Sequence, residues 1–134
     1  MNAERGVSSL AMVLMLLVLG SLMLQGLNQA QRQRLAMVND ESLAIQRTAQ
    51  AHSALQWGMR QPWGTEAGAQ CMTYAADTRV CLRLLIDGRL LLIAQSDGFS
   101  LWQSGRWAAG NLQFSAHGWS DFCPLKEALL CQIP

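Results

Sequence analysis

The first part of the chain is a long apolar segment. Residues 6–31 contain no charged side chain, and residues 7–24 read VSSLAMVLMLLVLGSLML. An uncharged apolar stretch of this length is long enough to cross a bilayer as a helix. Because no proline occurs before Pro62 and good helix formers dominate, the pattern predicts one long helix from Val7 to about Met59. Gly20 and Gly26 lie inside it, either as tolerated weak points or as places where a neighbouring helix approaches closely.

The second half of the predicted helix is amphipathic. Apolar or small residues recur at steps of three or four, with charged and amide side chains between them. This stripe consists of Leu35, Val38, Ser42, Ile45, Ala49, His52, Leu55 and Met59. We expect it to pack against another element.

The residues Gln61-Pro62-Trp63-Gly64 predict the end of the helix, and a loop is predicted to extend to Gln70. After this loop the spacing of apolar residues changes from that of a helix to that of strands. Alternating runs at 79–86 and 89–96 flank Asp87-Gly88, which predicts a type I′ turn with positive φ at both residues. Asp97-Gly98 leads to a run at 99–103, and Ser104-Gly105 to one at 106–108. Gly110-Asn111 leads to a run at 112–115. The pattern predicts an antiparallel meander of three to five strands.

One face of this sheet is predicted to be apolar and to need a cover. Its expected members are Val80, Leu82, Leu84, Ile86, Leu90, Leu92, Ala94, Phe99 and Leu101. The helical stripe is the large apolar surface left to cover them, so the fold class is predicted to be α+β.

The apolar segment has three interpretations: a cleaved secretory signal, a permanent anchor or a buried core helix. No good small-x-small cleavage site follows it, and no cysteine precedes Cys71, which excludes a lipoprotein signal. A small protein cannot bury a helix that is apolar all round. An anchor is therefore favoured. Flanking charges leave its orientation open, but four cysteines after it favour a C-terminal part in an oxidising periplasm.

Charge and motifs exclude several function classes. The net charge is +1 and the ten Lys and Arg residues are scattered, so no nucleic-acid contact is expected. The chain lacks a nucleophile elbow, a phosphate loop and a zinc-protease motif, so we expect no enzyme and no cofactor. The cysteine spacings lack the short pairs of zinc sites, and His52 and His117 are interpreted as packing or surface residues, so no metal is expected.

The cysteines Cys71, Cys81, Cys123 and Cys131 are expected to form two disulfides. Four cysteines allow three connectivities. We expect nearest-neighbour pairing, although the sequence does not exclude the crossed ones. Trp102, Trp107 and Trp119 fall in or beside predicted strands, where they serve either a contact with another subunit or the core.

The N-terminal residues carry a family resemblance. A short charged leader (1–5), Gly6 and an apolar helix that begins Val7-Ser8-Ser9-Leu10 resemble type IV prepilins and the pseudopilins of type II secretion. TRVCLRLL (78–85) and GWSDFCPLKEALLC (118–131) are similar to the small enterobacterial minor pilins of YgdB type. The resemblance implies the pilin ladle fold, cleavage by a prepilin peptidase after Gly6, and methylation at Val7.

The implied organisation is a leader at 1–6, a transmembrane and filament-core helix at 7–30, its amphipathic continuation at 31–60, and a periplasmic β domain at 61–134. The implied partners are other minor pilins, the major pilin, the prepilin peptidase, the inner-membrane assembly platform and membrane lipid. The family usually has a glutamate at the fifth mature residue, where this chain has Ala11. We therefore expect a minor pilin that starts assembly and occupies the filament tip. The alternative is a single-pass inner-membrane protein whose periplasmic domain binds a partner outside any filament.

Overall fold

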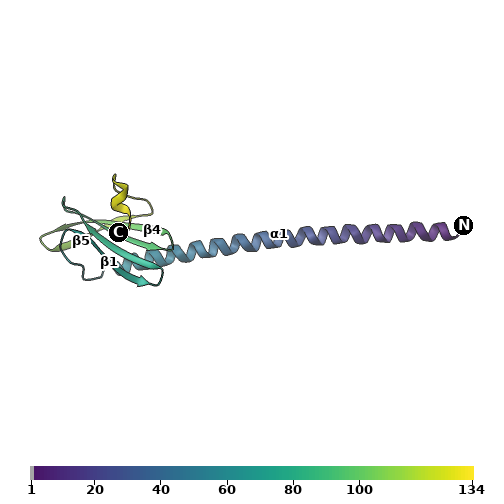
Figure 1. The fold of residues 1–134 in the computed structure, drawn as a ribbon, viewed down its shortest axis with the longest axis horizontal. Helices are drawn as coiled ribbons and strands as arrows, with labels where there is room; N and C mark the ends of the chain where they lie inside the picture. The colour runs from purple at the N-terminus through teal and green to yellow at the C-terminus, as the bar shows by residue number, and fades with distance from the viewer. Residues whose placement is uncertain (1) are drawn as a thin grey trace. The chain divides into compact units, whose positions relative to one another are not determined.

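The protein has an α+β fold in the computed structural model, which describes residues 2–134. Residue 1, part of the predicted leader, lies outside the described residues. One helix, α1 (Asn2–Gly58), is followed by five strands and a short 3-10 helix, η1 (Ala128–Cys131) (Figure 1). The chain divides into two compact units, 1–43 and 44–134. The predicted long helix is confirmed, and its end at Gly58 agrees with the break expected after Met59.

The second unit contains a single antiparallel sheet. Its strands are β1 (Gly68–Ala75), β2 (Thr78–Leu84), β3 (Arg89–Ser96), β4 (Phe99–Ala108) and β5 (Asn111–Ser120), and each pairs with the next (Figure 1). The predicted antiparallel meander is confirmed, but its strands differ from the predicted runs: β1 was not predicted, and the runs at 99–103 and 106–108 form the single strand β4. Val80, Ala94 and Leu101 lie opposite one another across β2, β3 and β4, which places the expected apolar residues on one face.

The last turns of α1 cover this face through small side chains. Ala51, Ala54 and Leu55 are buried, and they form one core cluster with the apolar residues of β2, β3 and β4. A Cβ atom at Gly58 would lie 2.6 Å from Val80 Cγ1, so glycine is needed there for the close approach of helix and sheet. These four positions recur at helical spacing on one face.

The predicted helical stripe is wrong over most of its length. Leu35, Val38 and Ile45 are 62–70% exposed, and of the stripe only Leu55 is fully buried. The physical reason is that close packing on a sheet selects alanine and glycine, which a search for large apolar residues passes over. The cover of the sheet is shorter than the pattern predicts.

The other face of the sheet is covered by the C-terminal segment. Leu91 and Ile93 of β3 form a second buried cluster with Cys131. Trp102, Cys123, Leu125 and Ile133 pack around it. β3 is thus buried on both faces, which explains why its sequence from Leu90 to Ala94 is apolar without alternation.

The turns follow the predictions at one Asp-Gly pair and depart from them at the other. Asp97 and Gly98 have φ values of 45° and 81°, as a two-residue type I′ turn requires. At 87–88 only Gly88 has a positive φ, and the Leu85 amide donates to the Arg89 carbonyl at 2.9 Å around a three-residue loop. The type I′ prediction is wrong there. As a result Ile86 lies in the loop, 97% exposed, and does not belong to the inner face.

The predicted turn at Ser104-Gly105 is also wrong, because both residues lie inside β4. A Cβ atom at Gly105 would collide with the Gln113 carbonyl oxygen and lie 3.0 Å from the Leu90 side chain. The register between β4 and β5 shifts at this point, where residues 115–118 of β5 bulge. Glycine therefore allows a close strand approach here and does not end the strand.

Candidate functional site

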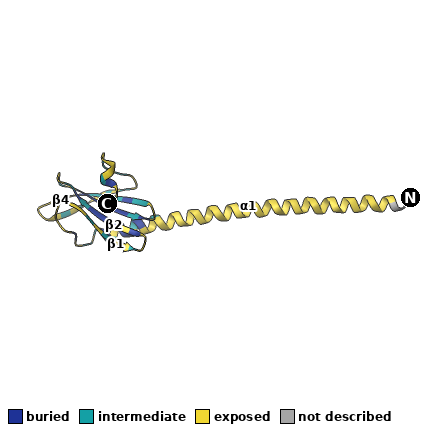
Figure 2. Ribbon diagram, viewed as in Figure 1, coloured by how far each residue is buried: buried dark blue, intermediate teal, exposed yellow. Residues whose placement is uncertain are grey.

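The apolar part of α1 is the first candidate functional feature. Its large apolar residues from Val7 to Leu27 are all more than half exposed, and the helix is coloured as exposed along this part (Figure 2). By length and composition this helix is able to cross a membrane, and its most apolar window is 0% buried. A Cβ atom added at Gly20 or Gly26 would meet no other atom within 4 Å, so both glycines leave open space beside the helix.

The residues of the expected processing site lie in the first turns of α1. Gly6 is exposed with open space around it, and Val7 is 69% exposed. Ala11 is one turn further on, so residues 7 and 11 share one face of the helix. A carboxylate at position 11 would lie beside the turn that contains Val7, whereas alanine leaves that face uncharged.

The first disulfide joins the outermost strand to the sheet. Cys71 and Cys81 lie directly opposite each other on β1 and β2, with their Cα atoms 4.0 Å apart. This is the nearest-neighbour pair expected from the sequence, but Cys71 lies in a strand where the sequence predicted the end of a loop. The bond fixes the register of β1 on β2.

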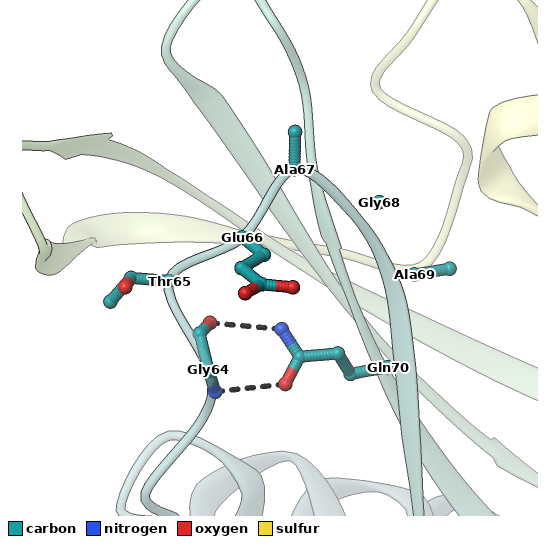
Figure 3. Close-up of a pocket in the computed structure, with 7 residues that line it drawn as sticks. All are labelled: Gly64, Thr65, Glu66, Ala67, Gly68, Ala69 and Gln70. Atoms are coloured by element: carbon teal, nitrogen blue, oxygen red, sulfur yellow. Dashed lines mark hydrogen bonds between the residues drawn. The ribbon is translucent and has the colours of Figure 1, made fainter.

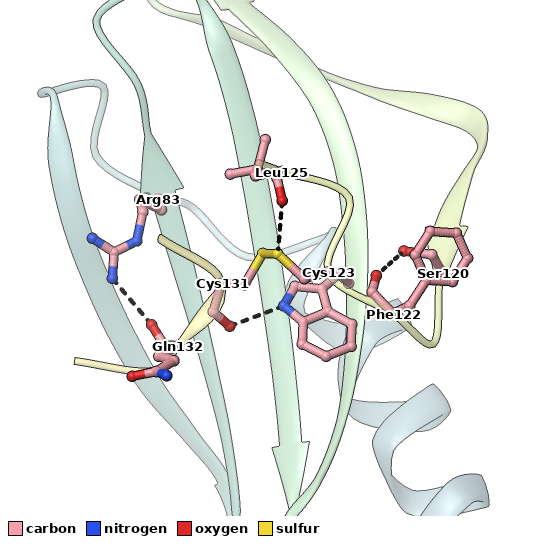
Figure 4. Close-up of a disulfide and its surroundings, with 8 residues drawn as sticks. Arg83, Ser120, Phe122, Cys123, Leu125, Cys131 and Gln132 are labelled. Carbon is pink, nitrogen blue, oxygen red and sulfur yellow. Dashed lines mark hydrogen bonds between the residues drawn. A yellow bond between two sulfur atoms is a disulfide. The ribbon is translucent and has the colours of Figure 1, made fainter. Parts of the chain in front are cut away.

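The second disulfide, Cys123–Cys131, closes the C-terminal loop against the sheet (Figure 4). Trp102 Nε1 donates a hydrogen bond to the Cys131 carbonyl oxygen at 3.0 Å, and Arg83 Nη2 donates to the Gln132 carbonyl oxygen at 3.1 Å. Both donors come from strands. The loop is therefore held to the sheet by hydrogen bonds as well as by apolar packing.

Most of the tryptophans have internal roles. The indole N–H of Trp63 donates to the Gly58 carbonyl at 2.6 Å and satisfies an acceptor at the end of α1, and that of Trp107 donates to the Leu85 carbonyl at 2.8 Å. Trp119 differs, because it is 55% exposed and contacts His52 edge-to-face with ring centroids 5.2 Å apart. Of the three candidate contact residues, Trp119 is the one left largely exposed.

A shallow pocket lies in the loop between α1 and β1 (Figure 3). The side chain of Gln70 bridges it, accepting from the Gly64 amide at 2.8 Å and donating to the Gly64 carbonyl at 2.9 Å. Glu66 is the single ionisable side chain in its lining. The hydrogen bonds of the Gln70 amide stabilise the loop. A single carboxylate in the lining does not form the acid–base pair that a catalytic site of this kind would use.

Charged groups of the second unit form surface pairs. Arg47 and Asp97 approach to 2.7 Å, and both side chains are exposed. The Arg89 backbone amide and guanidinium both donate to the Asp87 carboxylate and hold the pKa of that carboxyl below its ordinary value. Such exposed pairs contribute little to stability. Asp40 and Glu41 are exposed as well.

The histidines and cysteines do not assemble a metal site. Within residues 2–134, no group of three or more His, Cys, Asp or Glu side chains is placed to hold an ion. His52 packs against Trp119, and His117 is exposed in the β5 bulge.

These features define an α+β protein with a bilayer-length apolar helix and a disulfide-stapled antiparallel sheet. The chain belongs to the family described as "Protein of unknown function (DUF2509)", whose model matches residues 15–131. No curated protein and no solved structure gives a significant match.

Proposed function

We propose that this chain is a minor pilin-like subunit that helps to initiate assembly of a type IV pilus or a type II secretion-like filament. It is anchored in the inner membrane by α1 and carries its β domain in the periplasm. It acts without catalysis, cofactor or metal, by contacts with other minor pilins, the major pilin, the assembly platform and lipid.

The observation that carries the proposal is the composition of α1. A single helix of 57 residues begins with a bare apolar segment and ends in a short surface of small residues that packs on an antiparallel sheet. The uncharged residues 6–31 would span about 39 Å as a helix, enough for the hydrocarbon core of a bilayer. Because their side chains have no partner within the described chain, they need lipid or neighbouring helices around them.

Two further observations support the proposed location and processing of the chain. Both disulfides lie after the apolar segment, and disulfides persist in oxidising compartments such as the periplasm. The expected cleavage residues, Gly6 and Val7, are exposed at the start of the apolar helix. A prepilin peptidase would remove residues 1–6 on the cytoplasmic side and leave Val7 as the methylated N-terminus.

Ala11 suggests the place of this subunit in the filament. A charged side chain in the bilayer costs roughly 2.5–3.5 kcal/mol unless it is paired. A subunit with alanine avoids that cost and offers no carboxylate to the amine of a subunit above it. The subunit with none above it is the one at the tip, so we place this chain there.

The proposal is tested by the N-terminus of the mature protein. Gly6→Leu should leave a chain six residues longer in cells that contain prepilin peptidase, because the expected cleavage follows residue 6. Gly20→Leu, the same change deeper in the helix, should be processed normally. N-terminal sequencing with intact-mass measurement distinguishes the products. A wild-type protein that keeps Gly6 joined to Val7 would instead be a single-pass membrane protein whose periplasmic domain binds partners outside a filament.

A further inference from the structure

Arginine side chains gather at one end of the sheet, on the face opposite α1. This face carries Arg83 of β2, Arg89 of β3 and Arg106 of β4. Successive side chains of a strand alternate between the two faces, and the neighbouring Leu90 belongs to the core that α1 covers. Arg106 is directly opposite Arg89, and Arg83 is diagonal to Arg89. The fold therefore brings together basic residues that are scattered in the sequence.

Arg89 and Arg106 form a close cross-strand pair. The Trp107 amide donates to the Gly88 carbonyl at 2.9 Å, so residues 88 and 107 are a hydrogen-bonded pair. By alternation residues 89 and 106 are a non-hydrogen-bonded pair, whose Cα atoms are typically about 4.5 Å apart. Like charges directly opposite each other destabilise an antiparallel sheet. The stability of the fold therefore does not explain this pair.

One acidic side chain compensates for part of this positive charge. The Asp87 carboxylate accepts hydrogen bonds from the Arg89 amide at 3.0 Å and from Arg89 Nε at 2.6 Å. These bonds hold the Arg89 guanidinium by one edge. Arg106 is exposed, and among residues 2–134 its guanidinium forms no salt bridge or hydrogen bond. The pair therefore keeps a net positive charge and unused hydrogen-bond donors.

A shallow cavity lies beside this pair. It has a volume of about 400 Å³ and is formed by the loop between β2 and β3 and by the end of β4. Its lining includes Asp87, Arg89 and Arg106. On β5 the exposed Gln113 is directly opposite Arg106 and adds an amide donor. Donors from β3, β4 and β5 therefore form one row across the end of the sheet.

We propose that Arg89 and Arg106 bind a phosphate group, with Gln113 as a further donor. Guanidinium groups donate two parallel hydrogen bonds to phosphate oxygens, and their planar shape matches this ligand. A phosphate group carries a charge of about −1.5 to −2 near neutral pH, so it neutralises both arginines and removes their repulsion. A carboxylate carries a single charge and has fewer acceptor oxygens. Asp87 is a positioning residue that holds Arg89 beside the cavity.

Titration of the full-length protein with inorganic phosphate tests this site independently of the proposed function. The protein is kept in a non-ionic detergent that contains no phosphate, and phosphate replaces chloride at constant ionic strength. The NMR signals of the arginine Nε–H groups should shift and reach saturation at Arg89 and Arg106. Arg79 is the internal reference, since it is exposed on the same face at the other end of β2. Its signal should move little.

Arg106→Gln removes one of the two charges without removing a contact within the described chain. It should weaken phosphate binding about tenfold, the effect expected for the loss of one charge-assisted contact. The remaining amide signals should match those of the wild type, which shows that the sheet is intact. Arg79→Gln removes the same charge elsewhere on this face, and this matched control should bind phosphate as the wild type does.

Two further titrations define the ligand. Acetate should cause little shift at the same concentration, because it carries a single charge. Glycerol phosphate distinguishes the source: binding at least as tight as that of inorganic phosphate assigns the site to a phosphate ester, and weaker binding assigns it to the free ion. The proposal is overturned if the wild-type signals do not saturate, if Arg106→Gln binds phosphate as tightly as the wild type, or if acetate shifts the Arg89 and Arg106 signals as strongly as phosphate.

Discussion

Gly58 determines how closely the end of α1 approaches the sheet. Its missing side chain leaves space that Val80 and Leu92 occupy, and Ala54 and Ala51 continue the same surface one and two turns earlier. The Trp63 indole then donates to the Gly58 carbonyl and closes the helix end. The close approach of helix and sheet at this turn therefore depends on a residue without a side chain.

Gly58→Ala should destabilise the second unit. Its Cβ atom would meet Val80 Cγ1 and Leu92 Cδ2 at 2.6 and 3.2 Å, so the Val80 side chain or the helix must shift. Overpacking of this kind costs about 1–3 kcal/mol, more than the gain in helix propensity. Gln56→Ala, on the exposed side of the same turn, is the control. Chemical denaturation should place the midpoint of Gly58→Ala clearly below that of the control; equal midpoints would contradict the close packing.

At the scale of the elements, some helices and strands could be predicted from the sequence and others could not. The long helix was predictable because helix formers continue without a proline, and β2 and β3 were predictable because two apolar runs flank the turn residues Asp87-Gly88. β1 was missed, since Gly68, Ala69 and Gln70 have low strand propensity, and pairing with β2 and the disulfide hold it in place. The cover on the far face was missed because residues 121–134 have no regular period. The non-alternating run Leu90–Ala94 was the available signal for a second buried face.

The processing residues Gly6 and Val7 and the position of Ala11 could be proposed from the sequence only through resemblance. Under the proposed function their chemistry depends on a peptidase and on neighbouring subunits, and neither leaves a trace in the periodicity of the chain. The pairing of the cysteines is different. Register places Cys71 opposite Cys81, and packing on β3 places Cys131 beside Cys123, so the fold selects among connectivities that the sequence left open.

The two disulfides should contribute similarly to stability but differ in their effect on the C-terminal cover of the sheet. In the chain-entropy model each closes a short loop worth about 2.5 kcal/mol. Replacing Cys123 and Cys131 with serine should also loosen the cover over Leu91 and Ile93, whereas replacing Cys71 and Cys81 leaves that cover in place.

Binding of a fluorescent apolar dye and limited proteolysis check this difference. The Cys123/Cys131 variant should bind more dye and be cut first within residues 121–134. The Cys71/Cys81 variant, whose cysteines are 10 residues apart against 8 in the other pair, is the control and should lose a similar amount of stability without the gain in dye binding. Equal dye binding by both variants would show that the C-terminal segment stays on the sheet without its disulfide.

At the scale of the whole molecule, one uncharged position is expected to influence the order of subunits. Ala11 adds no carboxylate to the apolar helix, so this chain gains nothing from a subunit above it under the proposed function. Charge pairs in low dielectric contribute several kcal/mol before desolvation is subtracted, enough to change subunit order.

Ala11→Glu should relax the preference for the tip and allow the subunit within the shaft. Immunogold labelling of sheared filaments with an antibody to the β domain measures the distribution, and Ala11→Gln is a polar control without charge. Wild-type label spread evenly along the shaft would separate Ala11 from tip placement and leave only the broader assignment to a minor pilin.

The covering of β3 by the last residues of the chain has a consequence for biosynthesis. Leu91 and Ile93 stay exposed until residues 123–133 have been synthesised, because these residues form their cover. A chain that stops early therefore displays an apolar strand to the proteases and chaperones of its compartment. The second cluster of the core is therefore completed only when the polypeptide is complete, and a truncated product keeps an exposed apolar strand.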